Sequence, residues 1–214
     1  MSGQWEDRPE RWPVVTSDPI FDGAVISVRT DVVKSSVDGS TFTRDVVVHP
    51  GAVAIVAIDD DERVLVVSQY RHPVGHRLIE LPAGLRDVPG EPPLDAAHRE
   101  LYEEGHVRAA DWRVLADVFS SPGMTDEAIR VFLARGISAV PEDERFDGEH
   151  EEADMPVSWV PLAELVRAVL DGKVQNAVSC LGVLAAWSAR HDGGFDALRA
   201  PDAPWPAGAS PRHA

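Results

Sequence analysis

The alternation of apolar and polar positions predicts strands in the first part of the chain. The β-branched runs 25–33 and 41–49 are separated by a polar turn, which indicates a hairpin. Residues 51–59 are almost continuously apolar, as is typical of a strand buried on both faces. Residues 64–70 and 78–82 predict two more strands.

The second part of the chain alternates between helix and strand patterns. A Gly- and Pro-rich loop is expected over 83–93, and a hydrophilic loop over 141–155. The remaining expected elements are strands 112–119, 128–134 and 157–160, and helices 94–104, 162–170 and 174–189. This order predicts an α/β fold in which a mixed sheet has helices on both faces.

Composition limits the class of protein. The 214 residues are 44% apolar, which fits about one domain and excludes global disorder. The single cysteine, Cys180, excludes a disulfide framework. The polar N-terminus and the lack of a long apolar run predict a soluble, cytoplasmic protein without a membrane span. From Asp192 onward, frequent prolines predict a loose tail in which Trp205 hints at docking.

The formal charge of −16 is concentrated in two segments. Residues 80–104 carry a net charge of −5 and residues 141–155 a net charge of −7. Such a surface repels phosphate and makes nucleic acid and anionic membranes poor partners. Divalent cations held by these carboxylates would reverse the local sign, so small phosphate compounds are not excluded.

Three glutamates fall on one edge of the helix expected at 94–104. At about 100° per residue, Glu104 lies roughly 40° from Glu100, and Glu103 about 60° to the other side. Like charges at this spacing destabilise a helix unless a cation lies between them. A set of oxygen ligands favours Mg²⁺, or Mn²⁺, over zinc.

The segment from Gly84 to Glu104 resembles the Nudix box of the Nudix hydrolases, which reads Gly-x5-Glu-x7-Arg-Glu-apolar-x-Glu-Glu-x-Gly-apolar. Two departures are visible. Six residues instead of five separate Gly84 from Glu91, and His106 stands where the motif has glycine. That position would end the helix in a left-handed conformation, which glycine adopts freely and histidine at modest cost.

The flanking sequence resembles the ADP-ribose pyrophosphatase branch of that family, at residues 69–71, 80–84, 121–127 and 150–154. The resemblance implies a Nudix-type α/β/α sandwich with an N-terminal antiparallel strand region. It divides the chain into a β region at 1–50, a hydrolase domain at 51–190 and a Pro/Ala-rich tail at 191–214. It also implies a homodimer that exchanges N-terminal strands.

The resemblance assigns roles to individual residues. Glu100, Glu104, Glu103 and the Ala83 carbonyl would hold Mg²⁺, with Mn²⁺ as an alternative. The remaining roles are a catalytic base on the acidic loop (Glu152, with Glu151 as the alternative), substrate contacts (Arg71, Leu85, Ser121 and Glu127) and structural support (Gly84 and the Glu91–Arg99 ion pair). The implied reaction is hydrolysis of ADP-ribose to AMP and ribose 5-phosphate.

Two alternatives remain open at the level of sequence. Another nucleoside diphosphate derivative could be the substrate, such as a dinucleoside polyphosphate, a nucleotide sugar, FAD or NADH. A catalytically silent domain that binds ADP-ribose as a regulator is the second, although all three helix glutamates are retained.

Overall fold

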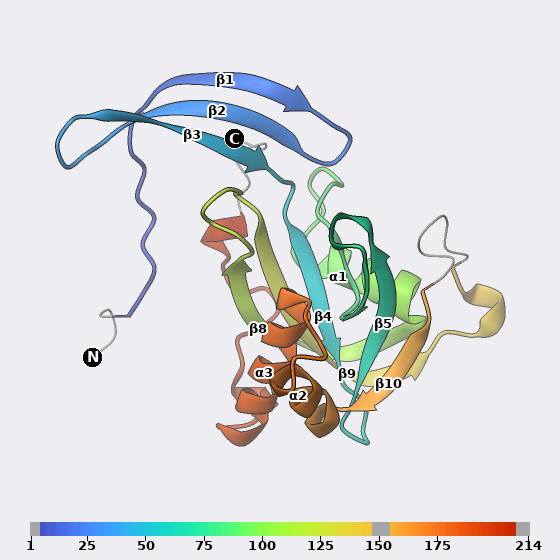
Figure 1. Ribbon diagram of the computed structural model, residues 1–214. Coiled ribbons are helices and arrows are strands. Elements are labelled where there is room, and N and C mark those ends of the chain that lie inside the picture. The colour runs from blue at the N-terminus through green and yellow to red at the C-terminus, as the bar shows by residue number, and fades with distance from the viewer. Residues whose placement is uncertain (1–4, 147–154, 209–214) are drawn as a thin grey trace. The chain divides into compact units, whose positions relative to one another are not determined.

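A computed structural model describes residues 5–146 and 155–208 (Figure 1). The chain divides into two compact units, Met1–His49 with Ser121–Asp126, and Pro50–Ser120 with Glu127–Ala214. The division at residue 49 lies next to the expected boundary at residue 50. Unlike the expected N-terminal region, the first unit also includes the distant segment 121–126, and the second continues past residue 190.

The first unit contains a three-stranded antiparallel sheet in the order β1 (Val14–Asp22), β2 (Ser27–Lys34) and β3 (Thr41–Val48). The hairpin expected from residues 25–49 is confirmed. The sequence pattern did not predict β1, because polar residues and Pro19 interrupt its alternation. Proline lacks a backbone N–H and is tolerated at the edge of a sheet, which is where β1 lies.

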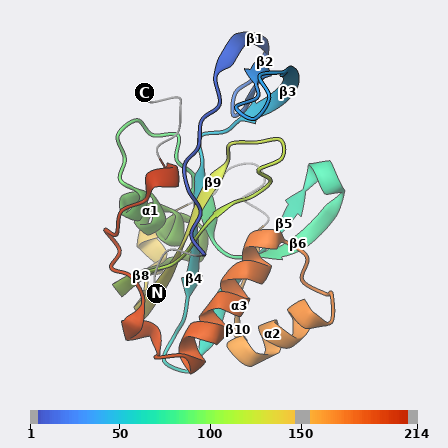
Figure 2. The same ribbon diagram turned by 90° about the vertical axis from the view of Figure 1, so that its left-hand side faces the viewer.

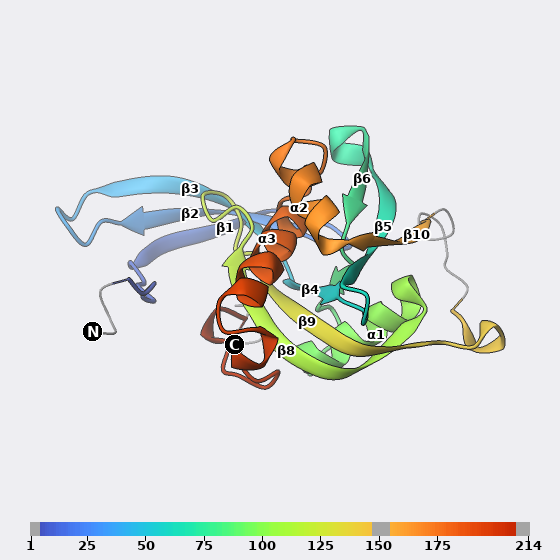
Figure 3. The same cartoon turned by 90° about the horizontal axis from the view of Figure 1, so that it is seen from below.

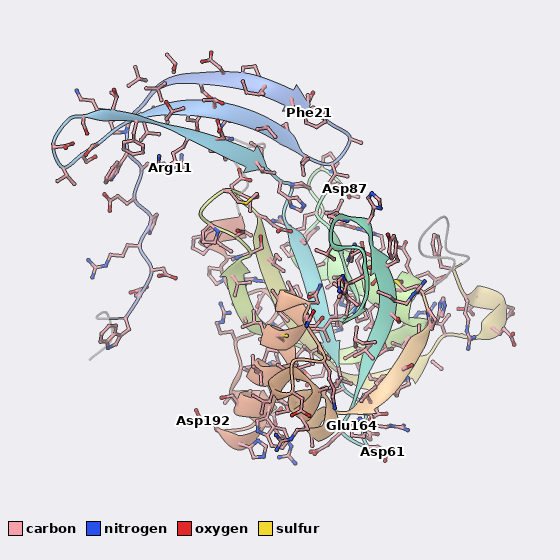
Figure 4. The ribbon with its side chains drawn as sticks, viewed as in Figure 1. Arg11, Phe21, Asp61, Asp87, Glu164 and Asp192 are labelled. Atoms are coloured by element: carbon pink, nitrogen blue, oxygen red, sulfur yellow. The ribbon has the colours of Figure 1, made fainter. Side chains whose placement is uncertain are left out.

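Every residue of β1 is exposed. Its large apolar side chains include Ile20, with 64% of its surface exposed, and Phe21, with 55% exposed, at the end of the strand (Figure 4). Val14 and Val15 are also more than half exposed. The strand therefore presents apolar surface that nothing in its own sheet covers.

The described residues of the second unit form seven strands in two sheets. One has the order β10-β5-β6 and the other the order β7-β4-β9-β8. Strand β4 runs parallel to β9, whereas the other neighbours are antiparallel, so the larger sheet is mixed as predicted. The strands are β4 (Ala52–Ala57), β5 (Arg63–Arg71), β6 (His76–Glu80), β7 (Ala83–Leu85), β8 (Val107–Phe119), β9 (Ala128–Ala139) and β10 (Val157–Pro161).

Successive residues of β4 point to two different cores. Val53, Ile55 and Ala57 pack with residues of α1 (Pro93–Gly105). The intervening residues pack with α2 (Leu162–Leu170) and α3 (Ala177–His191). Figure 3 shows α1 and the α2–α3 pair on different sides of β4 and β9. The strand buried on both faces and the α/β/α arrangement are therefore confirmed.

Several boundaries differ from the expected ones. Strand β8 begins at 107 instead of 112, and β9 continues to 139 instead of 134, because pairing between the two overrides weak strand propensity. The loop expected at 83–93 contains β7. Helix α3 begins three residues later than expected because the Asn176 side chain caps it, accepting a hydrogen bond from the Ser179 N–H at 2.9 Å.

None of the helices in the described ranges is long and apolar enough for a membrane span.

The loose tail expected from Asp192 is wrong for the described residues 192–208. Phe195–Ala197 form a 3₁₀ turn, and Arg199 makes a bridge with Val114 of β8. In Figure 2 this red segment runs beside β8 and α1. Long-range contacts with buried side chains hold it there, and no local sequence pattern reports such contacts.

Candidate active site

The glutamates of α1 meet the backbone of β7. Ala83 and Gly84 of β7 pair with β4, which fixes this short strand against the sheet. The Ala83 N–H donates a hydrogen bond to the Glu104 carboxylate at 2.9 Å. A Cβ atom built on Gly84 would lie 2.0 Å from the carboxyl carbon of Glu100. Only a glycine allows the strand and this carboxylate to approach so closely.

The two carboxylates are almost enclosed. Glu100 is 8% exposed and Glu104 9% exposed. They lie on consecutive turns of α1, and the adjoining residues Ala96, Ala97 and Leu101 of the same helix pack in the core. Buried carboxylates need a cation or several hydrogen-bond donors to remain ionised.

Arg99 supplies one such cation. Its Nε and Nη2 each donate to Glu91 at 3.2 Å, so the ion pair predicted between Arg99 and Glu91 is present. Its Nη1 donates to Glu100 at 2.5 Å and to Glu103 at 3.3 Å. The hydrogen bonds that Arg99 donates to Glu91, together with the charges of Glu100 and Glu91, raise the pKa of Arg99 despite its partial burial. The guanidinium therefore stays charged and ties the loop before α1 to the helix.

The four expected metal ligands come close to one another without forming a closed site. Across residues 5–146 and 155–208, no group of three or more His, Cys, Asp or Glu side chains is arranged to hold a metal ion. Arg99 Nη1 instead bridges the carboxylates of Glu100 and Glu103. The donors are nevertheless all oxygens, and the missing side chain of Gly84 lets the Glu100 carboxylate lie against the backbone of β7. These features fit a hard divalent cation such as Mg²⁺ or Mn²⁺.

His106 ends α1 as the departure from the motif suggested. Its φ of 52° and ψ of 34° are left-handed, and its N–H donates to the Tyr102 carbonyl at 3.2 Å. The Nδ1 atom of His106 is buried and has no hydrogen-bond partner among the described residues. The substitution thus leaves the helix end in place at the cost of backbone strain.

The expected substrate contacts are engaged within the protein. Arg71 donates through Nε and Nη2 to Glu80, at 3.0 and 2.7 Å, and Glu80 is only 3% exposed. The Ser120 hydroxyl donates to the Glu127 carboxylate. Leu85 pairs with Ala52 in the sheet.

The other expected residues lie in the first unit or outside the described residues. The carbonyl of Ser121 accepts turn hydrogen bonds from Met124 and Thr125, and Ser121 belongs to the first unit. Glu151 and Glu152 lie outside the described residues. Their roles stay predictions.

The start of the acidic loop is anchored by residues that the motif does not specify. The Tyr102 hydroxyl on α1 donates to the Glu144 carbonyl at 2.5 Å, and Arg108 pairs with the Glu144 carboxylate at 3.1 Å. The guanidinium of Arg108 lies 5.6 Å from the centre of the Tyr102 ring. Tyr102 occupies a variable position of the motif, so spacing alone gave no signal for this contact.

Comparisons with known proteins agree with this geometry. The model of the NUDIX domain matches residues 48–179. The chain is 46% identical over 191 residues to an ADP-ribose pyrophosphatase of Mycobacterium tuberculosis, covering 89% of each chain. It is 33% identical to an ADP-ribose pyrophosphatase of Bacillus subtilis, covering 82% of this chain and 95% of the relative.

A solved structure described as an ADP compounds hydrolase shares the fold. Its TM-score is 0.69 at 21% identity, with 87% of this chain and 99% of the other covered. The family match spans the strands and the helix that carry the carboxylates, and the relatives match almost end to end. The chain belongs to the Nudix family.

Proposed function

We propose that the protein hydrolyses the pyrophosphate bond of ADP-ribose to AMP and ribose 5-phosphate with Mg²⁺. The observation that carries the proposal is the contact of β7 with the Glu100 and Glu104 carboxylates in a Nudix motif. The substrate is supported by the relatives named ADP-ribose pyrophosphatase. We also place the protein in the cytoplasm.

Glu100, Glu104, Glu103 and the Ala83 carbonyl would hold the divalent cation. The cation, when bound, neutralises the pyrophosphate oxygens and lowers the pKa of the attacking water. The cation would compete with Arg99 for Glu100 and Glu103, because Nη1 of Arg99 bonds to both carboxylates. The double contact of Arg99 with Glu91 would hold the guanidinium nearby while that happens.

The acidic loop supplies the proton acceptor in this scheme. Glu152 takes the proton of the attacking water, and Glu151 is the alternative. Arg71, Leu85, Ser121 and Glu127 contact the substrate. For Arg71, a phosphate group of the substrate would compete with Glu80 for the guanidinium, since a phosphate and a carboxylate both offer two oxygens to its paired donors.

We further propose that residues 1–50 form a dimer by exchanging strands between two copies. The exposed apolar side chains of β1 support this, because an isolated three-stranded sheet would leave them in water. A dimeric mass by light scattering is expected. A monomer at micromolar concentration would count against the exchange and leave the hydrolysis proposal standing.

The hydrolysis itself is tested by chromatography of AMP released from ADP-ribose, with and without Mg²⁺. NADH, FAD, diadenosine polyphosphates and GDP-mannose serve as competing substrates. We expect Glu104→Gln to abolish most turnover, and Glu164→Gln on α2, an exposed glutamate, to leave it unchanged. Faster turnover of another compound would reassign the substrate, and no turnover of any would favour the silent binding domain.

A further inference from the structure

The backbone that leads into β7 is held by a different element at each of three consecutive residues. The Leu81 N–H donates to the Ser179 hydroxyl of α3 at 3.1 Å. The Pro82 carbonyl accepts a hydrogen bond from the Ile55 N–H of β4 at 2.8 Å. The Ala83 N–H donates to a glutamate of α1 at 2.9 Å. The placement of Ala83 therefore depends on α3 and β4 as well as on α1.

The bond between Leu81 and Ser179 satisfies two buried polar groups at once. Leu81 lies between the end of β6 and the start of β7 and is only 2% exposed, so its backbone N–H needs a partner within the protein. The hydroxyl of Ser179, which is 3% exposed, likewise needs a hydrogen bond to offset its burial. The two residues are 98 positions apart in the sequence, so only the packing of α3 brings them together.

The Ser179 hydroxyl is itself held in place. The Asn176 side chain accepts hydrogen bonds from the Ser179 N–H at 2.9 Å and from its hydroxyl at 3.2 Å. With its hydrogen directed to Asn176, the hydroxyl oxygen accepts from Leu81. One turn further along α3, a Cβ atom built on Gly182 would lie 2.6 Å from Cδ1 of Leu81 and 3.0 Å from Cγ2 of Val56. The start of α3 therefore packs closely against the segment before β7.

We propose that Ser179 is a positioning residue for the metal site, acting through Leu81 on the Ala83 carbonyl. Only Pro82 lies between the two residues, and its ring fixes its φ, so a rotation of the backbone at Leu81 is carried on to Ala83. Without the hydroxyl, the buried Leu81 N–H would have to turn toward another acceptor or stay unsatisfied. This inference rests on the proposed function for its metal site, but not on the identity of the substrate.

The test measures Mn²⁺ binding to the full-length protein by isothermal calorimetry, in the absence of substrate. Ser179→Ala removes the hydroxyl. Ser35→Ala is the matched control, because the Ser35 hydroxyl also belongs to a buried residue and accepts backbone hydrogen bonds, from Val37 and Asp38, but it lies in the first unit. Thermal melting by circular dichroism establishes that each variant is folded at the temperature of the titration.

We expect Ser179→Ala to weaken Mn²⁺ binding about tenfold, the lower end of the contribution from residues that orient metal ligands. Ser35→Ala should bind Mn²⁺ as the unaltered protein does. The rate of AMP formation by Ser179→Ala should recover at high Mn²⁺ concentration, as expected for a weakened metal site that keeps its catalytic groups. If Ser179→Ala does not fold, Ser179→Cys tests the same bond with the same result expected, since its thiol is only a weak acceptor.

Equal Mn²⁺ affinity in the folded variant and the unaltered protein would overturn the inference and leave the hydrolysis proposal standing, because Ser179 would then only support the fold. An equal loss of affinity in Ser35→Ala would overturn it as well. Weaker binding in Ser179→Ala alone, with no turnover of ADP-ribose by the unaltered protein, would support the inference and reject the hydrolysis proposal. Absence of saturable Mn²⁺ binding to the unaltered protein would reject both.

Discussion

Replacing Gly84 with alanine separates the cost to the fold from the cost to the proposed reaction. The new Cβ would lie 2.0 Å from Cδ and Oε1 of Glu100 and 2.4 Å from Oε2, whereas ordinary contacts begin near 3.4 Å. The carboxylate must therefore move by about 1.4 Å. Because the φ of Gly84 lies outside the left-handed range, the backbone itself accepts alanine.

The fold should tolerate this change. The group that has to move is the end of a flexible side chain, so the expected loss of stability is about 1 kcal/mol or less. The reaction should not tolerate it. A displacement of about 1 Å in a positioned group can cost roughly 100-fold in rate, which corresponds to about 2.7 kcal/mol of barrier height.

Gly172→Ala is the opposite case and serves as the control. Gly172 has a φ of +71°, and nothing lies within 4 Å of an added Cβ. Alanine there should cost about 1 kcal/mol in backbone strain and leave turnover unchanged. The assay combines initial rates of AMP formation at saturating Mg²⁺, thermal melting by circular dichroism, and Mn²⁺ binding by calorimetry.

Turnover within threefold of that of the unaltered protein, with equal Mn²⁺ binding, would contradict a positioning role for Gly84. Loss of activity only because the variant melts at the assay temperature would contradict it as well. A stable variant with weak Mn²⁺ binding and slow turnover is the expected result.

Three further predictions follow from other contacts. His106→Gly should raise the free energy of unfolding in urea by about 0.5–1 kcal/mol, since glycine relieves the left-handed backbone strain and removes the Nδ1 atom that has no partner among the described residues. A loss of stability would show that packing of the imidazole stabilises the fold. Glu152→Gln should retain Mn²⁺ binding by calorimetry and lose most turnover, and full activity would reject Glu152 as the base. Arg130→Met should lower the free energy of unfolding by roughly 3–5 kcal/mol in the same urea assay, because Asp117 and the carbonyls of Ala203 and Pro204 lose a buried partner. A change below about 1 kcal/mol would mean that Arg199 and water replace the Arg130 guanidinium.

Local pattern predicted most of the second unit. The continuous apolar run became β4, and the periodic run after it became α1, because each pattern reports burial of the residue itself. The motif also predicted the ion pair between Glu91 and Arg99, since both residues lie within one short segment. These features depend on residues close in sequence.

The features that the sequence pattern did not predict share a physical cause. Strand β1 exists because β2 pairs with it, despite Pro19 and its polar neighbours. The segment 192–208 is ordered by Arg130, whose hydrogen-bond partners at 203 and 204 are more than 70 residues away. Likewise, Gly84 was expected to support the structure, but its approach to Glu100 depends on how α1 packs against β7. A sequence contains no direct record of such distant partners.

The docking of the C-terminal segment also sets a time order for biosynthesis. Arg130 is synthesised 73 residues before Ala203, whose carbonyl it binds. At about 5–20 residues per second, a ribosome takes roughly 4–15 s to cover that interval. Throughout it, the nascent β9 carries a guanidinium that cannot yet be buried with all its partners. The burial of Arg130 with these partners therefore waits until residues 203 and 204 have been synthesised, and a ribosome that stalls after residue 190 would release a chain in which the guanidinium lacks both carbonyls.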